Sequence, residues 1–242
     1  IVLPAPDAEV LPGVHWGLAE EFLTPAYWAL QTRAGACCDD VFGDPRGSSL
    51  WDRIAFCLLG GHGITYEVND AAFQRLNQAA LFVGATPSRD EVEALLREPL
   101  PVNGRPVRYR FPRVKSEALC GAHERFQQSL APSTARGLRS WLLEFKGIGP
   151  KTASWIVRNH FGSDEVAILD IHVVRAGRLM GLFDGRDDVQ RHYFGMEEKF
   201  LAFAERLGVP ASRLDIVMWR QMRNAPETVN AACHQRGIAF NA

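Results

Sequence analysis

The chain has 242 residues, of which 47% are hydrophobic and 23% are charged, and its formal net charge is −1. These are ordinary values for a globular protein with a sizeable core, so the composition excludes an intrinsically disordered chain. A net charge near zero also excludes a general attraction to nucleic acid. Any phosphate binding must therefore come from a local basic surface.

The cysteines and the apolar segments indicate the setting of the protein. The five cysteines have no regular spacing, which predicts reduced thiols rather than a disulfide framework or a zinc site. No stretch approaches the roughly 20 apolar residues of a membrane span, and the first residues lack the pattern of a signal peptide. We therefore expect an intracellular protein, cytoplasmic if the source is prokaryotic, without membrane contact.

Apolar residues recur at spacings of three and four along most of the chain, which predicts a mainly helical fold. Clean alternation of apolar and polar residues is almost absent. Helical patterns are expected over residues 18–33, 50–59, 65–82, 92–96, 113–130, 134–145, 151–161, 171–183, 189–208 and 211–223.

Local signals predict where several of these helices begin and end. Ser48 or Ser49 should cap the helix over 50–59, and the sequence GGHG at 60–63 should end it. Ser88 and Glu91 stand three apart, the spacing of a capping box. Between the helices, the sequence VNGRPVRYRF contains Asn103-Gly104, a pair typical of a tight hairpin turn. We expect one small β-hairpin there.

The sequence LLEFKGIGPKTASWIVRN, residues 142–159, joins two helical patterns by a very short turn. Gly147 and Gly149 flank Ile148, and glycine tolerates the positive φ needed to end one helix and turn at once. Ile148 should point inward, and Pro150 suits the first turn of the next helix. The free N–H groups at that helix start could hold a phosphate without recognising base sequence. A plain helical hairpin that only packs is the alternative for a bare GxG.

The sequence after the turn makes a DNA-binding role for the turn more specific, because two separate blocks of residues match the pattern of one family. The stretch from Gly147 resembles the helix-hairpin-helix DNA glycosylase superfamily, and it covers about a sixth of the chain strongly. The matching residues are Gly147, Ile148, Gly149, Lys151 and Ala153, then Leu169, Asp170, His172, Val173 and Arg175.

The resemblance implies an all-α, two-lobed fold of the HhH-GPD type. A helical barrel lobe would span residues 48–158 and end in the helix-hairpin-helix. Residues 1–47 and 159–242 would together form the second lobe. DNA would bind across the cleft between the lobes, with Lys151 and Asp170 at its mouth.

The resemblance implies that Lys151 is an amine nucleophile and Asp170 the carboxylate of the active site. Breaking an N-glycosidic bond develops positive charge on the sugar, which a carboxylate stabilises. Apolar neighbours such as Ile156 would favour the neutral amine of Lys151. Each residue alone has a simpler interpretation, a solvated lysine for Lys151 and a helix N-cap for Asp170. His172 is expected to orient or pack near Asp170.

The resemblance to the archaeal 8-oxoguanine glycosylases implies which residues line the base pocket. Asp215 and Trp219 stand four apart on one helix face, and Trp155 lies one helical turn after Lys151. Gln31 is a further candidate. The simpler interpretations are that the two tryptophans are core residues and that Asp215 pairs with Arg213 or Arg220.

Other parts of the chain are candidates for contact with the DNA backbone. His62, in the glycine-rich segment, is placed to fill the gap left by a flipped nucleotide, although relatives carry asparagine or glutamine there. The densest basic run contains Arg105, Arg108, Arg110, Arg113 and Lys115, and of these Arg108 and Arg110 are the favoured phosphate contacts. A solvated loop histidine and a solvated basic hairpin remain the alternatives.

Together these expectations describe a base-excision-repair glycosylase and abasic-site lyase for an oxidised purine, with 8-oxoguanine favoured. Double-stranded DNA with a damaged base is the expected partner, the protein should be a monomer, and in a prokaryote it would be associated with the nucleoid. No metal or other cofactor is expected, because Cys233 alone near the C-terminus cannot hold an iron–sulfur cluster. A related glycosylase for an oxidised pyrimidine or hypermodified base and a non-catalytic DNA-binding relative are the alternatives.

Overall fold

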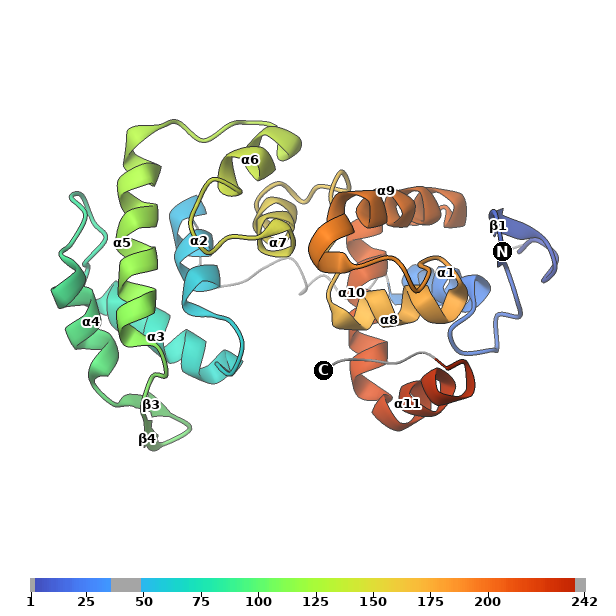
Figure 1. Cartoon of the computed structure of the whole chain (residues 1–242), viewed down its shortest axis with the longest axis horizontal. Coiled ribbons are helices and arrows are strands. Elements are labelled where there is room, and N and C mark those ends of the chain that lie inside the picture. The colour runs from blue at the N-terminus through green and yellow to red at the C-terminus, as the bar shows by residue number, and fades with distance from the viewer. Residues whose placement is uncertain (1–2, 36–48, 238–242) are drawn as a thin grey trace. The chain divides into compact units, whose positions relative to one another are not determined.

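The structure is a computed structural model that describes residues 3–35 and 49–237. These residues form helices and two short antiparallel hairpins (Figure 1). The helices are α1 (Pro25–Ala34), α2 (Leu50–Leu59), α3 (Tyr66–Gln78), α4 (Arg89–Arg97), α5 (Pro112–Gln128), α6 (Ala135–Leu142), α7 (Pro150–Phe161), α8 (Ile171–Met180), α9 (Val189–Leu207), α10 (Ala211–Asn224) and α11 (Pro226–Gln235). The strands are β1 (Glu9–Leu11), β2 (Val14–His15), β3 (Leu100–Val102) and β4 (Arg105–Val107). The expectation of a mainly helical fold is confirmed.

The chain divides into two compact units. One contains the described residues 3–35 and 157–237, and is called here the terminal unit; the other contains residues 49–156 and is called the central unit. The sequence interpretation placed the corresponding boundaries at residues 48 and 158. Helix α7 begins in the central unit and ends in the terminal unit.

The predicted helix starts are confirmed at α2 and α4. Ser49 caps α2, and its capping box is completed by Asp52. Ser88 caps α4 and is paired with Glu91 in the same way. The helix expected from residue 18 starts only at Pro25, because Leu23 has a positive φ of 74° and ends the preceding turn.

The predicted β3–β4 hairpin is confirmed. Asn103 and Gly104 have φ values of 50° and 75°, the two positive values that a type I′ turn requires. The β1–β2 hairpin was not predicted, because strands of two or three residues are too short to show alternation. Helix α11 was not predicted either.

The central unit is built around α2 and α5. Helix α2 packs against α3 and α5, and α5 also packs along α4 (Figure 1). Among the side chains fully buried between them are Ile54, Leu59, Phe73, Leu96 and Leu119. Burying each such side chain stabilises the fold by about 1.5–3 kcal/mol.

The terminal unit has its own core, formed by α1, α8, α9 and α10. Trp28, Phe200 and Phe203 are completely buried in it. Gly177 of α8 lies against the ring of Phe183, so closely that any side chain at this position would overlap the ring. Each unit therefore has a core of its own. Within residues 3–35 and 49–237, no helix combines the length and apolar character needed to cross a bilayer.

Candidate active site

The turn between α6 and α7 has the expected positive φ at the first of its two glycines but not at Gly149. Gly147 has a φ of +94°, in the region that favours glycine. Ile148 is 5% exposed, as predicted, and its N–H donates to the carbonyl of Phe145 at 3.0 Å. The side chain and the N–H of Ile148 are therefore both used within the turn.

Neither the backbone conformation at position 149 nor the neighbouring atoms require a glycine there. Its φ lies outside the left-handed region, and a Cβ built on it would meet no atom of the described chain within 4 Å. Its carbonyl accepts the first intrahelical bond of α7, from Ala153 N–H at 2.9 Å. The first N–H groups of a helix have no intrahelical partner and carry partial positive charge. The turn is thus open to an anion.

Lys151 lies in the first turn of α7 with an exposed side chain. Its ammonium makes no ion pair or hydrogen bond with any described residue. Trp155 follows one turn later on the same face of α7 and is half-buried. Ile156, expected to provide apolar surroundings for Lys151, is instead completely buried in the core.

Asp170 is the N-cap of α8, which confirms the simpler interpretation of this residue without excluding a role in chemistry. Its Oδ1 accepts from the N–H groups of His172 and Val173, each at 2.9 Å. Its Oδ2 makes no hydrogen bond with the residues that the structure describes. One oxygen is therefore held by the helix start while the other is available.

The loop before Asp170, residues 162–169, is held by side chains of α9 and α10. Tyr193 donates from its hydroxyl to the Ala167 carbonyl at 2.8 Å and accepts from Leu169 N–H at 3.3 Å. Glu197 accepts from Ala167 N–H at 2.9 Å. Asp164 in turn accepts from Ser212 N–H, at the start of α10, at 2.8 Å. These bonds fix the backbone from which Asp170 projects.

Asp215 of α10 is 2% exposed, and both of its carboxylate oxygens have partners inside the protein. Oδ1 pairs with Nη1 of the buried Arg158 at 2.5 Å, and Oδ2 accepts from Ile168 N–H at 3.0 Å. Burial raises the pKa of Asp215 to about 7, although Arg158 and the Ile168 N–H favour its carboxylate. The ion-pair partner of Asp215 is thus Arg158, not Arg213 or Arg220 as in the simpler interpretation.

The remaining pocket candidates of the terminal unit lie on α1 and α10. Trp219 is 38% exposed, and the guanidinium of Arg223 lies 5.1 Å from the centre of its ring. Gln31 is half-buried and accepts from Gln221 Nε2 at 2.9 Å, while Tyr27 bonds to the same Gln221 side chain. The simpler interpretation, that Trp219 is a core residue, is therefore wrong.

His172 is half-buried beside its N-cap Asp170. Burial lowers the pKa of His172, an effect that the charge of Asp170 opposes and that Arg175 and Arg223 reinforce. A neutral imidazole is consistent with the expected packing role.

The residues of the central unit expected to contact DNA are exposed. His62 lies between Gly61 and Gly63, both with positive φ, in the segment that follows α2. Arg108 and Arg110 flank the buried Tyr109, and Arg110 lies over the ring of Phe111 with 5.1 Å between guanidinium carbon and ring centre. All three side chains are accessible to a ligand.

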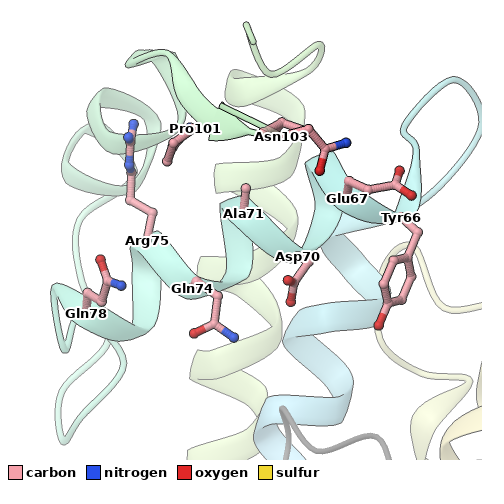
Figure 2. A pocket seen from close by; sticks show the side chains of 10 residues that line it. Tyr66, Glu67, Asp70, Ala71, Gln74, Arg75, Gln78, Pro101 and Asn103 are labelled. Atoms are coloured by element: carbon pink, nitrogen blue, oxygen red, sulfur yellow. The ribbon is translucent and has the colours of Figure 1, made fainter. Parts of the chain in front are cut away.

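A pocket of about 340 Å³ lies elsewhere in the central unit, between α3 and the β3–β4 hairpin (Figure 2). Glu67, Asp70 and Arg75 contribute charged groups to its wall. Arg75 donates to the carbonyls of Glu98 and Pro99 and so serves the fold. None of the site residues predicted from the sequence lines this pocket.

The structure brings the predicted residues together in two sets. The hairpin glycines, Lys151 and Trp155 belong to one turn and helix of the central unit, which also carries the loop with His62. Asp170, Asp215, Trp219 and Gln31 belong to the terminal unit. Among the described residues, no group of three or more His, Cys, Asp or Glu side chains is arranged to hold a metal ion.

Sequence reasoning missed Arg158 as a partner of Asp215. The signal was its place in α7, among the buried residues Ser154, Ile156 and Val157, since a cation on such a face needs an acidic partner. Local spacing could not identify this partner, because Asp215 lies 57 positions away in the chain.

Comparison with known proteins identifies a family model for 8-oxoguanine DNA glycosylase (Ogg-HhH) that matches residues 42–209. The 8-oxoguanine DNA glycosylase/AP lyase of Metallosphaera sedula is 31% identical over 116 residues, covering 46% of this chain and 57% of the relative. The Saccharolobus solfataricus protein of the same name is 29% identical over 187 residues, covering 72% and 83%. The match thus spans under two thirds of the Metallosphaera protein.

Two solved structures resemble the fold. The 8-oxoguanine DNA glycosylase of Thermotoga maritima aligns with a TM-score of 0.59 at 22% identity, covering 80% of this chain and 94% of that one. The Methanocaldococcus jannaschii 8-oxoguanine glycosylase/lyase, solved in complex with DNA containing 8-oxoguanine, aligns with a TM-score of 0.60 at 22% identity, covering 82% and 98%. At this identity the likeness establishes the fold alone.

Proposed function

The chain belongs to the Ogg-HhH family of 8-oxoguanine DNA glycosylases, and on this premise we propose that it excises 8-oxoguanine from double-stranded DNA and cleaves the resulting abasic site. The observation that carries the proposal is Lys151, an exposed lysine in the first turn of α7 whose ammonium has no partner among the described residues. An amine in this position supplies a nucleophile that a glycosylase using only water lacks.

The proposed reaction begins at C1′ of the damaged nucleotide. The neutral amine of Lys151 attacks C1′, the bond from C1′ to the base nitrogen breaks with its electrons going to the base, and the base leaves after taking up a proton. The sugar ring then opens as the bond from C1′ to O4′ breaks with its electrons going to O4′. O4′ takes up the proton that Nζ loses, which leaves a Schiff base between C1′ and Nζ. Loss of a proton from C2′ expels the 3′ phosphate by β-elimination.

Because Lys151 is exposed in the free protein, the complex with DNA has to exclude water from around its amine, since desolvation favours the neutral form over the ammonium. This requirement replaces the expected contribution of Ile156, which is buried in the core. In this proposal the amine of Lys151 becomes an effective nucleophile only in the complex with DNA.

Asp170 is proposed to stabilise the positive charge that develops on the sugar. The helix start holds Oδ1 and leaves Oδ2 to face the reacting group, so little reorganisation is needed during the reaction. The mechanism requires Lys151 and Asp170 to reach the same sugar when DNA is bound.

The extruded base is proposed to stack on Trp155 and Trp219 and to meet Gln31. Base extrusion costs a few kcal/mol, which stacking on an aromatic ring offsets. The exposed face of Trp219 and the half-buried Trp155 support these roles. Asp215 is proposed to act indirectly, since its two oxygens hold Arg158 and the loop that leads to Asp170.

The DNA backbone is proposed to be bound at the Gly147–Ile148–Gly149 turn, through the amides of Gly147 and Gly149, together with Arg108 and Arg110, while His62 enters the gap in the stack. The N–H of Ile148 holds the turn itself, through its bond to the Phe145 carbonyl. Double-stranded DNA is the proposed partner of a monomeric protein. The chemistry described uses only side chains of the chain itself and calls for no metal or other cofactor.

Borohydride trapping on a panel of duplexes tests the proposal. Duplexes with 8-oxoguanine, an oxidised pyrimidine or a preformed abasic site are incubated with the protein and reduced, and a covalent adduct is sought by gel electrophoresis and mass spectrometry. We expect an adduct with 8-oxoguanine and abasic duplexes that disappears in Lys151→Gln. Trp219→Ala should slow adduct formation on 8-oxoguanine far more than on the abasic site.

The other outcomes are equally informative. An adduct that forms only with oxidised pyrimidine would establish a related glycosylase of different specificity. Tight binding without an adduct on any duplex would indicate a non-catalytic DNA-binding protein and would overturn the proposal.

A further inference from the structure

The C-terminal end of α2 is held by side chains from a distant part of the central unit. Lys115 of α5 donates from Nζ to the carbonyls of Leu58 at 2.7 Å and Gly60 at 2.6 Å. The carbonyl between them, of Leu59, accepts from the hydroxyl of Tyr109 at 2.5 Å. Three consecutive carbonyls are thus bonded by two side chains.

These bonds have a clear electrostatic reason. The last carbonyls of a helix lack intrahelical partners and carry partial negative charge, so a cation and a hydroxyl are favourable there. Lys115 is half-buried, and this burial lowers the pKa of its ammonium. Its hydrogen-bond partners in the described structure are these backbone oxygens, so its charge is used inside the protein rather than on the surface.

The same two segments support the loop that follows α2. A Cβ added at Gly61 would lie 3.5 Å from Nζ of Lys115, and one added at Gly63 would overlap the guanidinium of Arg110. The backbone of the loop therefore rests directly on side chains of residues 110 and 115. His62, between the two glycines, is its exposed side chain.

The end of α2 also contacts the helix-hairpin-helix turn. A Cβ added at Gly147 would lie 3.3 Å from Cδ2 of Leu58, whose carbonyl Lys115 holds. The glycine loop and the hairpin turn are the two backbone segments of the central unit proposed to contact DNA, and both rest on the end of α2.

We propose that Lys115 is a positioning residue that, with Tyr109, holds the end of α2 so that the Gly60–Gly63 loop is presented in one conformation to the DNA stack. The inference rests on the proposed function for the identity of the ligand. The sequence alone grouped Lys115 with the neighbouring arginines as a basic run. The inference gives Lys115 a different role from theirs. Lys115 acts through the loop and makes no phosphate contact.

The test compares Lys115→Met with Arg97→Met, a control in the same unit because Arg97 is exposed on α4 and pairs with Glu93, outside the basic run. Hydrogen–deuterium exchange of the free protein is measured over residues 59–66. Affinity for an 8-oxoguanine duplex is measured from 50 to 200 mM salt. The rate of base excision is measured in a single turnover at saturating enzyme.

For Lys115→Met we expect faster exchange over residues 59–66, an unchanged salt dependence and a roughly 10- to 100-fold slower excision rate, the loss typical of misplaced groups. For Arg97→Met we expect unchanged exchange and an unchanged excision rate at saturation. If instead Lys115→Met lowers the salt slope by about one and leaves exchange and excision unchanged, Lys115 is a phosphate contact and the inference is overturned.

Two further variants keep the test decisive if Lys115→Met does not fold. Tyr109→Phe removes one hydroxyl, and it should raise exchange over the same residues to a smaller extent. Lys115→Arg keeps a donor to the carbonyls and should restore much of the protection. Unchanged exchange in Tyr109→Phe would overturn the inference. If the wild-type protein excises no base, the proposed function fails while the exchange data still decide how the loop is held.

Discussion

Glycine occupies each of the two positions of the hairpin turn, 147 and 149, for a different physical reason. Gly147 adopts a φ of +94° and lies close to Leu58, so a side chain there would strain the backbone and the packing. Gly149 has neither constraint, and a side chain there would project into open space. In the folded protein alone, nothing demands glycine at position 149. We propose that the close approach of a ligand to the backbone is what requires it.

Substitution of each glycine by alanine should therefore separate stability from binding. Gly147→Ala should lower the free energy of unfolding by about 1–2 kcal/mol, the cost of the left-handed conformation for an L-residue. Gly149→Ala should change it by less than about 0.5 kcal/mol, because the poorer helix cap and the stiffer unfolded chain have opposite effects. Its affinity for duplex DNA should nevertheless fall.

Urea denaturation and fluorescence anisotropy with a labelled duplex measure the two quantities. Unchanged DNA affinity in a folded Gly149→Ala protein would argue against backbone contact at this turn.

At the scale of elements, the ends of secondary structures are fixed by side chains from far along the chain. Tyr193 and Glu197 of α9 bond to the loop before α8, and Lys115 of α5 bonds to the end of α2. Both ends carry residues of the proposed site. The packing of whole helices therefore decides the geometry of loops that have little structure of their own.

A buried histidine links α5 to the segment before α4. His123 is 3% exposed, its Nδ1 lies 2.8 Å from Oγ1 of Thr86, and the rings of Trp51 and Phe82 lie 4.5 and 5.1 Å from its own. Burial lowers the pKa of His123, opposed in part by a backbone hydrogen bond with Phe82. Its neutral form is the one that fits the fold.

The sign of the pH effect follows from this shift. Below about pH 6.5, the value for an unfolded histidine, the unfolded chain binds a proton that the folded protein resists, so stability should fall as the pH drops. The loss approaches at most about 1.4 kcal/mol per pH unit. Above that pH the contribution of His123 is constant.

Unfolding free energies from denaturant titrations at pH 7.5 and 5.5 check this expectation. The decrease should be smaller in His123→Asn, which keeps a polar partner for Thr86, than in the wild-type protein. His62→Gln, at an exposed histidine, should retain the full decrease. Equal slopes in all three proteins would show that His123 is already protonated in the fold or does not titrate.

At the scale of the whole molecule, a net charge of −1 means that the proposed binding of DNA depends on where the cations are. Several basic residues are already committed: Arg158 to Asp215, Lys146 to Glu117 and Lys115 to carbonyls. Arg108 and Arg110 are exposed on the central unit. We therefore propose that local cations and backbone amides, rather than bulk charge, supply the affinity for DNA.

The double variant Arg108→Ala, Arg110→Ala should therefore weaken binding strongly and lower the slope of log affinity against log salt by about two, at roughly 0.9 per phosphate contact. Arg97→Ala is the matched control, because Arg97 is ion-paired with Glu93 on α4. Anisotropy titrations between 50 and 200 mM salt measure the slope. A slope that the control and the double variant lower equally would exclude these arginines as specific phosphate contacts.

Local sequence was sufficient for the elements whose signals lie within a few residues. The capping boxes at Ser49 and Ser88, the Asn103-Gly104 turn and the glycine turn before α7 were all predictable, because each is set by the conformational preferences of neighbouring residues. The helix-hairpin-helix family was predictable from two short blocks of residues. The β1–β2 hairpin and α11 were not, since their patterns are too short or too weak.

The sequence by itself therefore determined the helical fold class, the family and the presence of a lysine and an aspartate suited to glycosidic chemistry. Only the tertiary structure decided what each side chain does with its polar atoms. It showed Asp215 bonded to Arg158, Ile156 buried away from Lys151, and Lys115 bonded to the end of α2. The reason is physical: spacing along a chain specifies local backbone geometry, whereas partners 50 or more residues away are selected by how helices pack.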